Sequence, residues 1–193
     1  LGRFLAKLGP TNPDAIRVSY HGDITEKDTS LISRTVLTGY LEAARPDGQV
    51  NIVNSTAVAH DMGLEVAESI INASTEYSEL IIAELSKGNK KFRVAGTIIG
   101  QSPRIVGIDH LYVDTNIKGH FLIVRNDDRP GIVGLVGSAL GEAGLNIANL
   151  SLARNKSKGD ALNVIELDTA PSNEIIAQLS ASPGVLSVTA VKI

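Results

Sequence analysis

The sequence of 193 residues contains no cysteine and no tryptophan, and aromatic residues make up only 4% of it. Without cysteine the chain has no disulfide and no thiolate chemistry, which fits a reducing compartment, so we expect a cytoplasmic protein. No apolar run reaches the roughly 20 residues that cross a bilayer. The formal charge is only −3, with acidic and basic residues interspersed. We therefore expect contact with neither a membrane nor nucleic acid.

The sequence also lacks any constellation of residues that would carry catalysis. Four histidines occur without metal-ligand spacing and are interpreted as surface or structural residues: His21, His60, His110 and His120. Gly131, Gly134 and Gly137 do not match the G-x-G-x-x-G fingerprint of dinucleotide sites, and close packing of a helix on a sheet explains them better. We expect no catalytic residue, no cofactor site and no metal site in this chain.

The first part of the sequence predicts an α+β domain. Apolar spacing indicates a helical face at 1–8, a strand at 16–20 with one wet face, a helix from about 29 to 44, a strand at 50–53, a helix at 55–62 and an extended segment at 64–70. Asp28 or Thr29 is placed to cap the long helix, and Gly63 to end the short one. We expect the first eight residues to end a helix that began before this chain.

Three further apolar segments, at 80–85, 92–99 and 104–108, are separated by short turns that contain glycine. This spacing is typical of hairpins and predicts an antiparallel sheet, with a helical turn as the alternative at 80–85. An extended piece at 111–113 then leads to a linker at 116–119.

The remaining residues predict a β-α-β-β-α-β order, with elements at 121–125, 130–143, 146–154, 161–168, 173–180 and 185–193. This order is typical of a ferredoxin-like split βαβ fold. Pro130 suits the first turn of its helix, and Gly144 is placed to end that helix in a left-handed conformation. A polar hairpin loop is expected at 155–160. Such a sheet has open edges, which favour pairing with a second copy.

Polar side chains surround the first helix of this second part. Asn126 and Asp128 lie at the turn before the helix, and Asn146 lies just beyond its end. The N-terminus of a helix attracts a carboxylate, and Asp128 beside it is suited to an ammonium group. These three residues therefore suggest a site for a free amino acid. In the alternative interpretation Asp128 caps the helix or pairs with Arg129, and Asn146 satisfies backbone groups at a turn.

The motifs in this part resemble those of an ACT domain, a small regulatory module that often binds amino acids. The resemblance rests on Asp-Arg-Pro-Gly-Ile at 128–132, Gly-Leu-Asn-Ile-Ala at 144–148 and Ser-Pro-Gly-Val at 182–185, in that order around a strand and a helix. It covers residues 119–193.

The wider chain resembles long-form D-3-phosphoglycerate dehydrogenase, through segments at 17–24, 38–42, 50–55, 96–100 and 103–109. The resemblance implies the end of a preceding catalytic region and linker at 1–12, an intervening (allosteric substrate-binding) domain at 13–117 and an ACT domain at 118–193. It implies a mixed α/β first domain with an antiparallel sheet, so the fold class is α+β.

The same resemblance implies a function. The full enzyme oxidises 3-phosphoglycerate with NAD, the first committed step of L-serine synthesis, and its catalytic domain lies upstream of this chain. L-Serine binds between paired ACT domains in a homodimer or homotetramer, which places Asn126, Asp128 and Asn146 in the effector pocket. The family often has His or Tyr where this chain has Asn126. The alternatives are the β chain of an iron–sulfur L-serine dehydratase and a free-standing amino-acid sensor.

Overall fold

The computed structural model describes residues 1–73, 75–155 and 159–193. These residues form two compact units, Leu1–His110 and Leu111–Ile193. The domain limits given above, with a boundary after residue 117, stay a prediction. Part of the polar loop expected at 155–160 lies outside the described residues.

The first sheet is mixed. Its strands are β1 (Ala15–Gly22), β2 (Glu65–Ile71), β3 (Glu79–Lys87), β4 (Lys90–Ile99), β5 (Ser102–Ile108) and β6 (Leu111–Asn116), in the order β2-β1-β3-β4-β5-β6. The hairpins β3–β4 and β4–β5 are antiparallel, which confirms the hairpin prediction. The β1–β2 pair is parallel. The parallel pair was not predicted, because apolar spacing does not reveal the direction of a strand that follows a long helical crossover.

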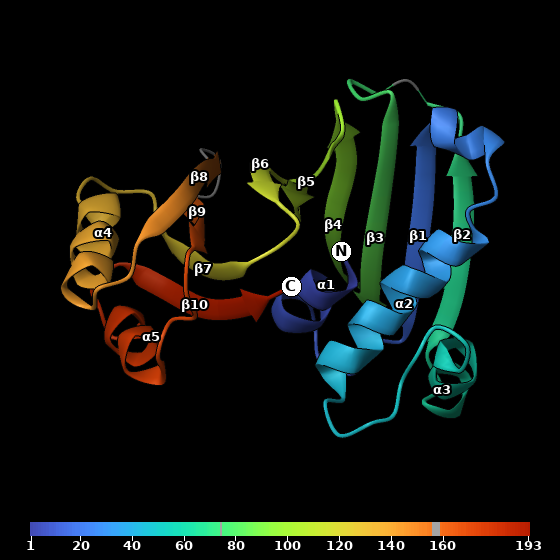
Figure 1. The fold of residues 1–193 in the computed structure, drawn as a ribbon, viewed down its shortest axis with the longest axis horizontal. Helices are drawn as coiled ribbons and strands as arrows, with labels where there is room; N and C mark the ends of the chain where they lie inside the picture. The colour runs from blue at the N-terminus through green and yellow to red at the C-terminus, as the bar shows by residue number, and fades with distance from the viewer. Residues whose placement is uncertain (74, 156–158) are drawn as a thin grey trace. The chain divides into compact units, whose positions relative to one another are not determined.

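Helices cover one face of this sheet (Figure 1). They are α1 (Gly2–Leu8), α2 (Ser30–Ala44) and α3 (Ser55–Asp61), with a 3₁₀ turn η1 at Asp23–Glu26. Helix α2 buries Val36, Leu37 and Leu41. The hydroxyl of Tyr20 on β1 donates to the backbone oxygen of Thr29, which ties the strand to the start of α2.

Helices α1 and α2 approach each other so closely that Gly2 leaves no room for a side chain. A Cβ atom on Gly2 would lie 2.0 Å from the carbonyl oxygen of Val36 and 2.6 Å from the backbone nitrogen of Tyr40. The neighbouring side chains of Phe4 and Leu5 are fully buried. The short α1 is therefore held by packing rather than by its own helix propensity.

Two local predictions in this unit are wrong. Residues 50–53 do not form a strand: 50 and 51 are irregular, 52 and 53 lie in a turn, and Val53 is 87% exposed. The side chain of Asn51 accepts from the backbone N–H groups of Val53 and Asn54, so side chains replace strand partners in satisfying this backbone. The second error concerns β1, which was expected to have one solvent-exposed face. Only Arg17 on that face is exposed; Ser19 is buried, and its hydroxyl shares a hydrogen bond with that of Ser69 on β2.

The second unit has the β-α-β-β-α-β order expected from the sequence. Its elements are β7 (His120–Asp127), α4 (Ile132–Glu142), β8 (Ile147–Asn155), β9 (Asp160–Leu167), α5 (Asn173–Ser180) and β10 (Val185–Lys192). The strands form an antiparallel sheet in the order β10-β7-β9-β8. Helices α4 and α5 lie together on one face of it (Figure 1), where Leu122, Val136, Leu140 and Leu179 share a core. The α+β class and the ferredoxin-like topology are confirmed.

The ends of α4 show which local signals were correct. Gly144 has φ +70°, and the N–H groups of Gly144 and Leu145 donate to the carbonyls of Gly141 and Leu140, which is a Schellman ending. Pro130, in contrast, is not in the first helical turn. It precedes Gly131, the N-cap, whose φ of +95° changes the chain direction before the helix starts.

The glycines of α4 do not serve close packing. A Cβ atom on Gly131, Gly134 or Gly137 would meet nothing within 4 Å. The interpretation that they allow the helix to approach the sheet is therefore wrong, because these positions lie on the side of α4 away from its buried residues.

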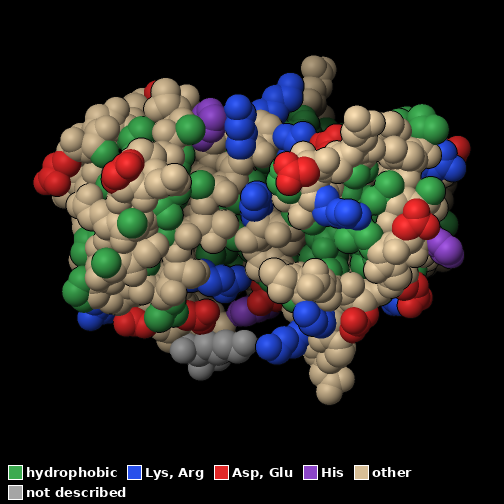
Figure 2. All heavy atoms as spheres, turned by 90° about the horizontal axis from the view of Figure 1, so that it is seen from below, with side chains coloured by type: hydrophobic (Ala, Val, Ile, Leu, Met, Phe, Trp, Pro, Cys, Tyr) green, Lys and Arg blue, Asp and Glu red, His purple; other side chains and the backbone are tan. Residues whose placement is uncertain are grey.

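The surface carries charges of both signs. On the face drawn in Figure 2, Asp and Glu side chains lie among Lys and Arg side chains. Among the residues that the structure describes, no helix is long and apolar enough to cross a membrane.

Candidate functional site

The turn between β7 and α4 is held in place by backbone hydrogen bonds to two other turns. The N–H of Asp127 donates to the carbonyl of Gly184 at 2.8 Å, and that of Asp128 donates to Gly159 at 3.0 Å. These bonds join three loops at one end of the second sheet. The position of Asp128 is therefore set by the fold itself.

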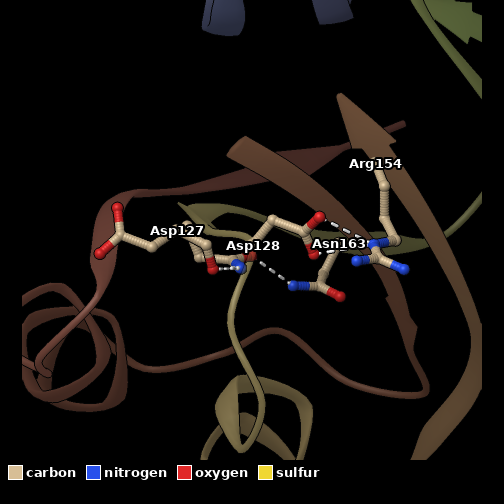
Figure 3. A network of polar contacts seen from close by, with 5 residues as sticks. Asp127, Asp128, Arg154 and Asn163 are labelled. Carbon is tan, nitrogen blue, oxygen red and sulfur yellow. Dashed lines mark hydrogen bonds and ion pairs between the residues drawn. The ribbon is translucent and has the colours of Figure 1, made fainter. Parts of the chain in front are cut away.

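Asp128 forms an ion pair with Arg154, near the end of β8. The Nε of Arg154 lies 2.8 Å from both carboxylate oxygens of Asp128. Dashed lines mark these contacts in Figure 3. The Asp128 side chain is only 17% exposed, whereas that of Arg154 is 54% exposed. Within the described ranges, the two Nη atoms of Arg154 make no hydrogen bond, so they remain available to a ligand.

The alternatives considered for Asp128 are not what the structure contains. The N-cap of α4 is Gly131 and not Asp128, and Arg129 lies against Gly184 and not against Asp128. A Cβ atom on Gly184 would fall 2.3 Å from an Nη of Arg129, so this guanidinium covers the glycine of the turn before β10. Sequence reasoning missed Arg154. The one signal for Arg154 was its place near the end of a predicted strand. Its pairing with Asp128 depends on the register between β8 and β9, which the sequence does not show.

Asn126 lies beneath this turn and is 3% exposed. Its Nδ2 donates to the carbonyl of Asp127 at 2.6 Å, and its Oδ1 accepts from Nδ2 of Asn163 at 2.7 Å. Both ends of its amide are therefore used inside the unit. Asn163, on β9, is 1% exposed and was not singled out from the sequence.

Asn146 lies at the opposite end of α4 and is exposed. Its Nδ2 donates to Oδ2 of Asp168 at 2.6 Å. The helix has 11 residues, so at about 1.5 Å per residue it is about 16 Å long. Within one chain the structure brings Asn126 close to Asp128, and it leaves Asn146 a helix length away.

The histidines lie on different elements and do not form a cluster in the part of the chain that the structure describes. His110 Nδ1 lies 2.7 Å from Asp109 Oδ2, and His60 Nδ1 lies 3.7 Å from Asp61 Oδ1. His21 is buried on β1. The described residues contain no group of three or more His, Cys, Asp or Glu side chains able to hold a metal ion.

Comparison with known proteins assigns the first unit. Residues 1–109 match the family described as the D-3-phosphoglycerate dehydrogenase intervening domain. This chain belongs to that family. The match covers α1 to β5, so the intervening-domain assignment rests on the mixed sheet and its helices. The turn that holds Asp128 lies in the second unit, outside the match.

Curated D-3-phosphoglycerate dehydrogenases are similar over most of the chain. The Bacillus subtilis protein is 30% identical over 90% of this chain and 33% of its own length. The Archaeoglobus fulgidus protein is 28% identical over 92% of this chain and 34% of its own. The Methanocaldococcus jannaschii protein is 28% identical over 100% of this chain and 36% of its own. The chain thus spans about a third of the length of these relatives.

Proposed function

We propose that this chain is the regulatory region of a D-3-phosphoglycerate dehydrogenase and that its second unit is an ACT-type module that binds L-serine. Family membership and the long similarity to dehydrogenases support the first statement. The observation that carries the second is the Asp128–Arg154 pair at the start of α4 in a βαββαβ unit. A larger enzyme of this kind would bind NAD in an upstream domain.

The pair offers two complementary groups to a zwitterion. The carboxylate of Asp128 accepts hydrogen bonds from an α-ammonium group, and the Nη groups of Arg154 donate to an α-carboxylate in the planar geometry that guanidinium favours. The first N–H groups of α4 have no partner within the helix and add positive potential on the carboxylate side. Because Arg154 is half exposed, a ligand can reach the pair from solvent.

The asparagines have different roles in this proposal. Asn126 forms the floor of the site and positions the turn through its bond to the Asp127 carbonyl. Asn146 completes the site from a second copy, because within one chain α4 separates it from Asp128. The edge strands β8 and β10 present backbone groups suited to such pairing. Serine held between two copies would restrain domain movement and reduce turnover in the full enzyme.

Of the alternative assignments, the intervening-domain match supports the dehydrogenase over the iron–sulfur serine dehydratase. The coding sequence upstream of Leu1 discriminates between them, since the dehydrogenase requires a dinucleotide-binding domain there.

The proposal is tested by calorimetry on this chain with L-serine and two truncated analogues. 3-Hydroxypropanoate lacks the ammonium group, and ethanolamine lacks the carboxylate. We expect heat of binding with L-serine and at least tenfold weaker binding of either analogue, because each loses one charge-assisted contact of about 1.5–3 kcal/mol. Equal binding of serine and 3-hydroxypropanoate, or no binding of serine, would refute the site.

A further inference from the structure

A pocket lies in the first unit, far along the chain from the β7–α4 turn. Its volume is about 250 Å³, and it lies where the segment before β1, the end of α2 and the end of α3 meet. The residues that line it are Asn12, Pro13, Tyr40, Arg45, Met62 and Leu64. All six belong to the compact unit Leu1–His110.

The polar groups of this lining are unused. Tyr40 is only 3% exposed, yet its hydroxyl has no hydrogen-bond partner among the described residues. Burial raises the pKa of Tyr40, so the phenol remains neutral and can donate a hydrogen bond. Arg45 is exposed, and its guanidinium makes no hydrogen bond or ion pair with any residue that the structure describes, so it is free to meet a ligand from solvent. The hydroxyl of Tyr40 is open to the pocket on an otherwise buried side chain, so a ligand there can accept its hydrogen bond.

The walls are preformed by hydrogen bonds to backbone carbonyls. On one side, Lys87 Nζ donates to the carbonyl of Thr11 at 2.7 Å, which holds the segment that carries Asn12 and Pro13. On the other, the N–H of Arg45 donates to Leu41 at 2.8 Å and that of Leu64 to Ala59 at 2.9 Å. A ligand would therefore enter the pocket without first ordering its walls.

We propose that this pocket binds a small monocarboxylate with a short apolar body. Arg45 is the one charged group of the lining and pairs with one carboxylate, while Tyr40 donates a second hydrogen bond to it. Pro13, Met62 and Leu64 supply apolar walls. The pocket is smaller than the roughly 300 Å³ at which drug-sized sites begin, so the ligand has few heavy atoms.

The surrounding helices argue for a single charge. Arg45 and Met62 are the C-cap residues of α2 and α3, and the C-terminal ends of helices carry partial negative charge. A singly charged carboxylate that reaches Arg45 tolerates this potential better than a doubly charged phosphate does. The site is therefore selective for carboxylates over inorganic phosphate.

The test is a titration of this chain with 3-methylbutanoate, followed by amide chemical shifts. We expect saturable shifts of the Arg45, Met62 and Leu64 amides, with a dissociation constant of about 1 mM, typical of so few contacts. The neutral analogue 3-methylbutanamide and inorganic phosphate should bind at least tenfold more weakly. Absence of saturable shifts with 3-methylbutanoate, or equal binding of phosphate, overturns the proposal.

Two variants locate the contacts. Arg45→Gln should weaken binding of 3-methylbutanoate at least tenfold, and Tyr40→Phe several-fold, since it removes only the unpartnered hydroxyl. The matched controls are Arg34→Gln, an exposed arginine on the same helix, and Tyr112→Phe, an exposed tyrosine on β6. The controls should bind as the wild type does. If Arg45→Gln remains folded and binds equally well, the pocket is not the site.

Discussion

The carboxylate of Asp128 and the Nε of Arg154 lie 2.8 Å apart, which joins the turn before α4 to the end of β8. Asp128 is mostly covered, whereas Arg154 is half exposed. An isolated pair at the surface stabilises a fold by only about 0–1 kcal/mol, so stability alone is a weak reason for this arrangement. The proposed binding of a zwitterion would give the pair a role that matches its geometry.

Replacing Asp128 by asparagine tests its role in binding the ammonium group. Asp128→Asn keeps the shape and removes the charge, so we expect L-serine to bind roughly tenfold to a hundredfold more weakly. The unfolding free energy should fall by no more than about 1 kcal/mol. Asp127→Asn, at the exposed neighbouring position, is the matched control and should bind serine normally. Calorimetry and urea denaturation measure the two effects separately.

Arg154→Gln distinguishes a contact with the ligand from a competing ion pair. If Arg154 holds the carboxylate of serine, the variant binds serine at least tenfold more weakly, and this is the expected result. If Arg154 only competes with the ammonium group for Asp128, the variant would bind serine more tightly. Calorimetry on the two folded proteins decides between these outcomes.

Self-association through the second unit is expected from its open edges. Light scattering at about 100 µM should show at least a dimer, since even a weak interface is populated at that concentration. L-Serine should increase the dimer fraction, because the proposed site includes Asn146 from the second copy. A monomer with and without serine would contradict the shared site.

Two glycines should respond to alanine in opposite ways. Gly2→Ala places a methyl group against the backbone of α2 and should destabilise the first unit by about 3 kcal/mol or more. Gly134→Ala meets no neighbour and should stabilise α4 by about 0.5–1 kcal/mol, the usual gain from replacing helical glycine. Urea denaturation of both variants measures the difference. A neutral Gly2→Ala would show that α1 does not pack on α2.

Buried tyrosines should make the first unit sensitive to alkali. Burial raises the pKa of Tyr20 and of Tyr40 above the ordinary value of 10.0. The stability linked to these phenols is therefore fully present below pH 10 and declines as pH rises above it, because the unfolded chain ionises first. Tyr40→Phe should make this decline shallower, whereas Tyr112→Phe, at an exposed site, should leave it unchanged. Denaturation between pH 8 and pH 11, a range around the reference pKa, measures it.

Local signals in the sequence were sufficient for most elements. Gly63 and Gly144 end their helices with positive φ, as expected from glycine after an apolar helical stripe. The signals failed at 50–53, where β-branched residues suggested a strand. There the side chains of Asn51 and Asn54 bond to nearby backbone groups, and this local alternative is stronger than the strand preference.

The sequence predicted only part of the candidate site. Asp128 stands out because it follows a strand and precedes a helix. Arg154 does not, because its contact with Asp128 depends on the register in which β8 pairs with β9. The same holds for Asn163, whose bond to Asn126 joins two strands far apart in the chain.

The position of β1 has a consequence for how the first unit forms. Its hydrogen-bonding partners, β2 and β3, both come after α2 and α3 in the sequence. An emerging chain therefore makes β1 long before either neighbour exists, and its two edges stay unpaired until first β2 and then β3 have been synthesised. Contacts this distant in sequence slow folding and lengthen exposure of an apolar strand. Refolding of the first unit should thus be slower than refolding of a helical protein of equal size.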